Sequence, residues 1–145
     1  MGASGWDYFV AYQPDLNEAL RALRDKVLAE GDYWWAVPGK PASAYGNRPR
    51  SFAELFADEG VQTDGTHSIL DMDHVLADGE DPDYGTVQPV TDDEALQYAG
   101  TKTLTREHVA AIDDLVTRRW FGRCAILHDA SGTPNEIYFW GYSGD

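Results

Sequence analysis

The order of strand-like and helical segments along the chain is the feature that most constrains its fold. Strand-like runs stand near both ends of the sequence, and segments with helical periodicity lie between them. This order predicts an α+β fold, in which a small, mostly antiparallel sheet of about four strands carries three to four helices packed on one face. No internal repeat or linker divides the sequence, so residues 1–145 are predicted to form a single globular domain. The expected strands cover 8–12, 66–76, 123–128 and 136–142, and the expected helices cover 15–31, 51–60, 91–100 and 105–120.

Paired residues mark where most of these helices begin. A side chain that can accept from backbone N–H groups is followed three positions later by glutamate, which is the capping-box spacing. The segment 105–120 begins instead at Thr105 and has arginines in its last turn, where cations suit the helix dipole. The three capping-box pairs are Asp15–Glu18, Ser51–Glu54 and Thr91–Glu94, and their helices are expected to end at Gly31, Gly60 and Gly100.

The composition indicates a folded chain in spite of its acidity. The sequence is 43% hydrophobic and holds five tryptophans and eight tyrosines, whereas disordered chains are poor in aromatic residues. Cys124 is the only cysteine, which rules out an internal disulfide and favours a reducing compartment. No apolar run approaches the length of about 20 residues that a spanning helix needs, and no signal-like segment is visible. These features predict a soluble, cytoplasmic protein.

Negative charge is concentrated in the middle third of the sequence. Residues 51–101 contain no lysine or arginine but hold thirteen of the twenty-five carboxylates, whereas the flanking segments are close to neutral. The net charge of -14 therefore arises almost entirely from this region. A localised negative field repels nucleic acid and anionic lipid and attracts cations or a basic protein. The expected partner is therefore a basic protein, with no nucleic acid and no membrane, and no oligomeric state is predicted.

Within the acidic region, the expected strand 66–76 carries the best candidates for metal ligation. Alternation along a strand would place Asp71 and Asp73 on one face, and two carboxylates on one face can hold a hard cation. His67 and His74 are close enough in sequence to serve as a ligand or a base. The same pattern is also typical of a solvated acidic strand. No cofactor is required by the sequence, and a divalent metal ion is the one cofactor that these residues would suit.

Two further segments are candidates for contacting a partner. The segment 77–89 carries Asp78, Glu80, Asp81 and Asp83 without the ligand register of a calcium-binding EF-hand. The segment 33–50 has loop composition and contains the adjacent pair Trp34–Trp35, and tryptophan is enriched at interface hot spots. At least one ring of this pair is expected to be partly exposed. A nucleophilic role for Cys124 is not favoured, because alternation places it on a core face of its strand.

Three hypotheses about function follow from these features. The first is a non-enzymatic binding or inhibitor protein, of the immunity-protein kind, whose acidic central region engages a basic partner. The alternative is a small metal-dependent enzyme of the hydrolase type that uses Asp71, Asp73 and a nearby histidine. In the third, the charge serves solubility alone, which agrees with a bacterial-like composition that has only three lysines.

Overall fold

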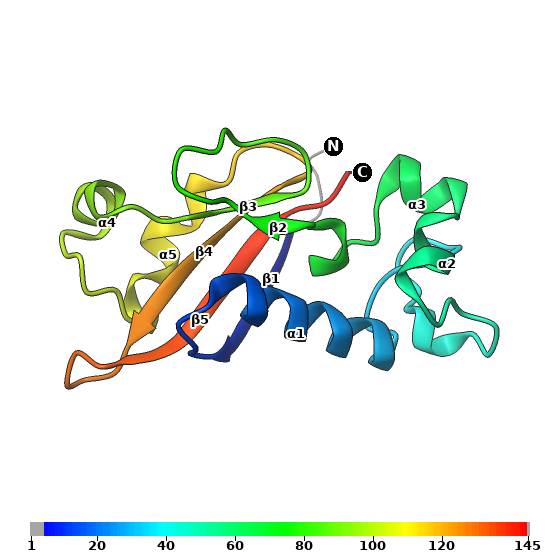
Figure 1. The fold of residues 1–145 in the computed structure, drawn as a ribbon, viewed down its shortest axis with the longest axis horizontal. Coiled ribbons are helices and arrows are strands. Elements are labelled where there is room, and N and C mark those ends of the chain that lie inside the picture. Colours follow the sequence, from blue (N-terminus) through cyan, green and yellow to red (C-terminus); the bar gives the residue numbers. More distant parts are fainter. Residues whose placement is uncertain (1–4, 145) are drawn as a thin grey trace.

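The five strands form one mixed sheet in the order β1-β5-β4-β3-β2 (Figure 1). The computed structural model describes residues 5–144 of the chain. The α+β prediction is confirmed, but the sheet has five strands rather than about four, and its β4–β3 and β3–β2 pairs are parallel. The antiparallel pairs are β1–β5 and β5–β4. The strands are β1 (Gly5–Ala11), β2 (His74–Val75), β3 (Thr86–Pro89), β4 (Phe121–His128) and β5 (Pro134–Tyr142).

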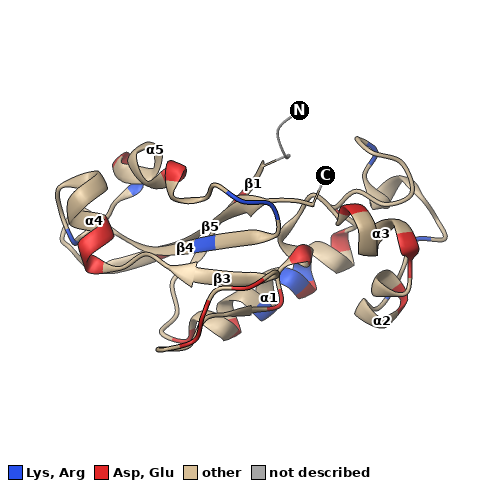
Figure 2. Cartoon of the chain, turned by 90° about the horizontal axis from the view of Figure 1, so that it is seen from above, with Lys and Arg blue, Asp and Glu red and all other residues tan. Residues whose placement is uncertain are grey.

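The helices cover both faces of the sheet, which corrects the prediction that they pack on one face. Alternation along β5 explains the arrangement, because its side chains point to opposite faces in turn. Ile137 and Phe139 lie in a core with α1, whereas Tyr138 and Trp140 lie in a second core with α4 and α5. Figure 2 shows α1 on one side of the sheet and α4 and α5 on the other. The helices are α1 (Leu16–Glu30), α2 (Phe52–Phe56), α3 (Glu59–Asp64), α4 (Asp92–Ala99) and α5 (Val109–Ile112), with single 3₁₀ turns η1 (Ala42–Ala44), η2 (Ile69–Asp71), η3 (Arg106–His108) and η4 (Asp113–Leu115).

The predicted start and end signals of α1 and α4 are confirmed. The Asp15 side chain accepts from two backbone N–H groups at the start of α1, and Gly31 ends this helix in the left-handed conformation. At α4, Thr91 and Glu94 form a reciprocal capping box, and Gly100 ends the helix. These signals act within a few residues, so local sequence is sufficient to set them.

Two other predicted helices were wrong in extent. The segment 51–60 divides into α2 and α3, because Asp58 caps a second helix by accepting from the Val61 N–H. Gly60 therefore lies inside α3 and does not end a helix. The segment 105–120 forms only η3, α5 and η4 and leaves helical geometry at Val116. Its last helical turn contains two adjacent aspartates, which oppose the negative end of a helix dipole.

The predicted strand 66–76 was also wrong for most of its length. It contains the turn η2 and then only the two residues of β2. Ile69, Leu70 and Met72 are all buried, so burial does not alternate as it would on a half-exposed strand. Asp71 and Asp73 consequently do not share the face of a strand. The strand β3, in contrast, was not expected, because it lies in a segment without periodicity and is defined by its parallel pairing with β4.

A tryptophan and two glycines pack closely at one end of the sheet. Gly122 on β4 and Gly141 on β5 are paired across the two strands, and the Trp6 ring of β1 lies against both. A Cβ atom at Gly141 would lie 2.5 Å from the Trp6 ring and 2.7 Å from the Phe121 carbonyl oxygen. Only glycine fits at this position without displacing backbone.

A buried ion pair connects α4 to the sheet. The Arg123 side chain on β4 is 9% exposed, and its guanidinium donates to the carbonyl oxygens of Gln88 and Pro89 and to both carboxylate oxygens of Glu94. Burial opposes ionisation, but hydrogen bonds from Arg123 and Thr91 hold the pKa of Glu94 below its usual value. The pair therefore links β3, β4 and the first turn of α4. Within residues 5–144, no helix is long and apolar enough to cross a membrane.

Candidate functional site

The acidic loop, which we define as residues 76–85, connects the parallel strands β2 and β3. Parallel neighbours need a connection that returns the chain to the same end of the sheet. Because β2 has only two residues, a short loop without a helix is enough for this return. The loop contributes Asp78, Glu80, Asp81 and Asp83, and all four residues are exposed. Figure 2 shows the acidic residues of this loop in red near β3, at the edge of the molecule.

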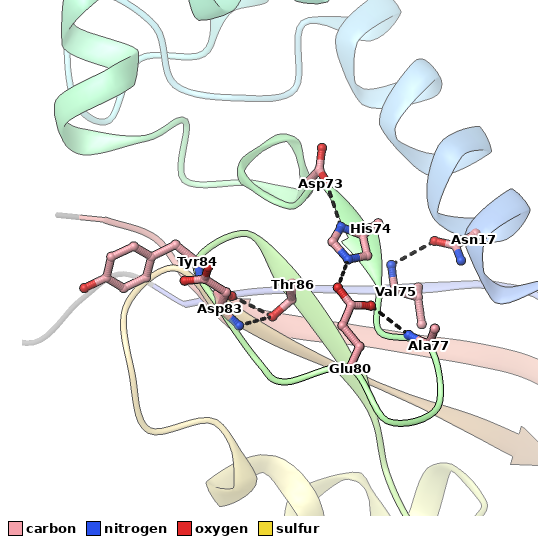
Figure 3. Close-up of polar contacts among 9 residues, drawn as sticks. All are labelled: Asn17, Asp73, His74, Val75, Ala77, Glu80, Asp83, Tyr84 and Thr86. Carbon is pink, nitrogen blue, oxygen red and sulfur yellow. Dashed lines mark hydrogen bonds and ion pairs between the residues drawn. The ribbon is translucent and has the colours of Figure 1, made fainter.

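The position of β2 at the edge of the sheet is fixed from α1. The Val75 N–H donates to Asn17 Oδ1 at 2.8 Å, so a side chain of α1 satisfies an edge-strand group (Figure 3). The acidic loop therefore begins from an anchored strand rather than from a free edge.

His74 holds the acidic loop against β2 by bridging two carboxylates. Its Nδ1 lies 2.7 Å from Asp73 Oδ2, and its Nε2 lies 2.5 Å from Glu80 Oε2 (Figure 3). The hydrogen bonds to Glu80 and Asp73 raise the pKa of His74. The other Glu80 oxygen accepts from the Ala77 N–H. The hydrogen bonds from the Ala77 N–H and from His74 lower the pKa of Glu80. A protonated His74 thus fixes the loop at its middle.

The remaining carboxylates of the loop differ in whether they have hydrogen-bond partners within the protein. Asp83 accepts from the Tyr84 N–H, and its backbone forms a turn with the Thr86 hydroxyl. Among the described residues, no hydrogen bond or ion pair engages the carboxylates of Asp78 or Asp81. Tyr84, which follows Asp83 in the loop, is 68% exposed, and its ring meets the Phe121 ring edge-on with 5.6 Å between the ring centroids. The loop therefore presents two uncommitted carboxylates and an aromatic ring to solvent.

The four predicted metal ligands are not brought together as a cluster. Asp71 Oδ1 accepts from the Thr66 N–H at 2.7 Å and from the Thr66 hydroxyl at 2.9 Å, so this carboxylate closes the turn that precedes β2. Asp73 and His74 are adjacent and bonded to each other, whereas His67 packs elsewhere, against the Trp34 ring. Within residues 5–144, no three His, Cys, Asp or Glu side chains are arranged so that they could hold one metal ion.

The adjacent tryptophans line a cleft beside α3. Both rings are half-buried, which confirms the expectation of partial exposure. His67 lines the same cleft, together with Asp58 and Asp64 from either end of α3. These two aspartates were not among the predicted site residues, because α3 was not predicted as a separate helix. The capping spacing from Asp58 to Val61 is the signal that could have identified them.

Cys124 is buried, as its position in the strand pattern predicted. Burial raises the pKa of the Cys124 thiol to about 12, so the thiolate is negligibly populated at neutral pH. The side chain packs in the core between α1 and the sheet.

The chain was also compared with known proteins. No protein-family model, no curated protein and no solved structure matches it. The acidic loop and the cleft are therefore the two candidate sites of this mixed-sheet α+β protein.

Proposed function

We propose that this protein is a non-enzymatic binding protein, of the inhibitor or immunity-protein kind, that docks a basic partner protein on its acidic loop. The observation that carries the proposal is the exposed pair Asp78 and Asp81 on a loop that His74 holds in place. No lysine or arginine occurs in residues 51–101 to neutralise these carboxylates from within the same region. The cytoplasm is part of this proposal, because a single cysteine that forms no internal disulfide is typical of a reducing compartment.

Electrostatics gives such a surface a defined role. Complementary charge steers encounter, and steering can raise association rates by about 10 to 10³. A loop that is already fixed by the Asp73–His74–Glu80 contacts loses less conformational freedom on binding than a mobile one. Tyr84, which is exposed on the same loop, adds apolar contact area, and tyrosine is common at interface hot spots.

The test compares two variants with equal loss of charge. Asp78→Ala/Asp81→Ala removes the two uncommitted carboxylates of the loop, and Asp25→Ala/Glu30→Ala removes two exposed carboxylates of α1. Immobilised wild-type protein is expected to capture a basic protein from a lysate of the source cells, and capture should weaken as the salt concentration rises. The loop variant should lose this capture, and the α1 variant should keep it.

Mass spectrometry identifies the captured protein, and its affinity and association rate are then measured with the purified components. Equal association rates for the wild type and for Asp78→Ala/Asp81→Ala would contradict docking on the acidic loop. A captured protein that is not basic would contradict the charge-complementarity argument.

A further inference from the structure

A second contact point for the partner is the cleft beside α3, which we define by Trp34, Trp35, Asp58, Asp64 and His67. We infer that this cleft accepts the guanidinium of an arginine side chain. The inference rests on the proposed function, because the arginine would belong to the basic partner. Figure 1 places α2 and α3 beyond the end of the sheet and apart from the loop between β2 and β3, so the two contact points are separate.

The size of the cleft favours a single side chain over a larger ligand. Its volume is about 260 Å³. Pockets for drug-sized ligands run from about 300 to 1,000 Å³, so this cleft lies below that range. It is partly open to solvent, and it is lined by the segment 34–38 and by residues of α3. A side chain that enters from a partner surface matches both properties.

The negative charge of the lining residues favours a cationic occupant. Asp58 and Asp64 line the cleft, and no lysine or arginine is found among the described residues that line it. Asp58 Oδ1 accepts from the Val61 N–H, and Oδ2 accepts from the Trp35 indole N–H at 3.3 Å. A carboxylate offers about four acceptor sites, so Asp58 retains capacity for a further donor. An anionic or neutral occupant would leave these carboxylates partly desolvated without compensation.

The aromatic walls favour guanidinium over ammonium. A guanidinium is planar and weakly hydrated, and it can stack on an indole while it donates to a carboxylate. Because Asp58 lies beside the Trp35 ring, a cation bound to this carboxylate is also next to the indole. An ammonium ion has a compact, strongly hydrated charge and gains less from such a site.

The cleft is held in shape before any partner arrives. The Trp34 N–H donates to the Thr66 carbonyl oxygen at 2.8 Å, and the Trp34 ring centroid lies 3.7 Å from that of His67. Ala36 and His67 adopt positive φ values of 67° and 55°, and only one other non-glycine residue in the described chain, Trp120, does so. Such conformations are strained in residues other than glycine, and they concentrate at binding and catalytic sites. Two of the three strained residues therefore line this one cleft.

Titration with a single-residue probe tests the cleft without the partner. The probe is N-acetyl-arginine amide, and the readout is the NMR signals of the Trp34 and Trp35 indole N–H groups in the full-length protein. We expect saturable shifts of these signals, with N-acetyl-citrulline amide, the neutral isostere, producing none. N-acetyl-lysine amide should bind more weakly than the arginine probe. Equal binding of the lysine or citrulline analogue would overturn the guanidinium assignment.

Variants locate the binding. Asp58→Asn keeps an oxygen that can cap α3 but removes the charge, and it should weaken the arginine probe at least about tenfold, because a charge-assisted hydrogen bond is lost. Asp64 is exposed, so Asp64→Ala should weaken binding of the arginine probe only about threefold. Asp25→Asn on α1 is the matched control and should bind as the wild type does.

Unchanged probe affinity in both cleft variants would overturn the inference, and so would shifts confined to the acidic loop. Failure of the proposed function has a different signature. In that case partner capture is insensitive to Asp78→Ala/Asp81→Ala, and these substitutions do not touch the residues that bind the arginine probe.

Discussion

Removal of Glu94 tests whether the buried ion pair stabilises the fold. In the folded protein the Arg123 guanidinium has four oxygen acceptors, two of which belong to Glu94. Glu94→Ala leaves the Arg123 cation, whose side chain is 9% exposed, with only two carbonyl oxygens and no counter-charge. It also removes the acceptor for the Thr91 N–H, which completes the capping box of α4.

The size of the effect follows from these contacts. Loss of one partner of a fully buried pair costs about 3–5 kcal/mol. The Glu94 side chain is 26% exposed, so water reaches the vacated position and reduces this cost to about 2 kcal/mol. The lost cap contributes about 1 kcal/mol more. A total of about 3 kcal/mol corresponds to a fall in Tm of about 6–12 °C for a domain of this size.

Denaturant and thermal unfolding at pH 7 measure this loss, with two variants for comparison. Asp93→Ala removes an exposed carboxylate in the same turn and should cost at most about 1 kcal/mol through the helix dipole. Glu94→Gln keeps the capping geometry and should fall between the other two. If Glu94→Ala destabilised the protein no more than Asp93→Ala, the ion pair would not be a source of stability.

The same pair makes a prediction about pH. Because the pKa of Glu94 is lowered on folding, its contribution is present above the ordinary value of 4.5 and is lost as the pH falls through the folded value. The stability difference between the wild type and Glu94→Gln should therefore shrink on acidification below pH 4.5. A difference that stayed constant down to the acid-unfolding range would contradict the assigned pKa direction.

Three further outcomes are expected. The pKa of His74, measured as its NMR titration midpoint, should lie above the ordinary value of 6.5 and should fall in Glu80→Gln. The stabilisation from this contact is fully present below pH 6.5 and should disappear as the pH rises through the folded pKa. An unchanged midpoint in Glu80→Gln would contradict the bridge between His74 and Glu80. Gly141→Ala should cost about 1–3 kcal/mol in chemical unfolding because its Cβ would meet Trp6, whereas Gly46→Ala, which has open space, should be nearly neutral; equal effects would refute the packing argument. Mg²⁺, Mn²⁺, Zn²⁺ or Ca²⁺ should leave the Tm unchanged, and an increase that Asp73→Asn abolishes would instead support the metal-dependent hydrolase.

The elements that could be predicted depend on short-range signals. The start and end of α1 are set by Asp15 and Gly31, and the hairpin of β4 and β5 is set by two apolar runs around a turn. The strand β3 depends instead on its pairing with β4, which is more than thirty residues away in sequence. Its own residues carry no periodicity that would indicate a strand. Short strands of this kind are stabilised by the neighbours that they meet only in the folded chain.

The candidate sites also differ in whether local sequence or distant contacts define them. The acidic loop was visible in the sequence, because four carboxylates occur within six residues. The cleft was not, since Trp34, Asp58 and His67 come from separate segments that the fold brings to one place. The predicted pair Asp71 and Asp73 does not share a strand face, because this segment forms the turn η2 and only the two residues of β2. Thr66 engages the Asp71 carboxylate, and His74 engages that of Asp73.

By itself, the sequence determined the amount and regional distribution of charge, the start and end signals of α1 and α4, and the α+β class. Charge is a sum over residues and caps are local, so neither requires knowledge of distant contacts. Only the tertiary structure decided which carboxylates remain available, because availability depends on partners within about 3 Å. The Glu80 carboxylate is hydrogen-bonded to His74, and the Glu94 carboxylate accepts from Arg123. Asp78 and Asp81 are exposed to solvent.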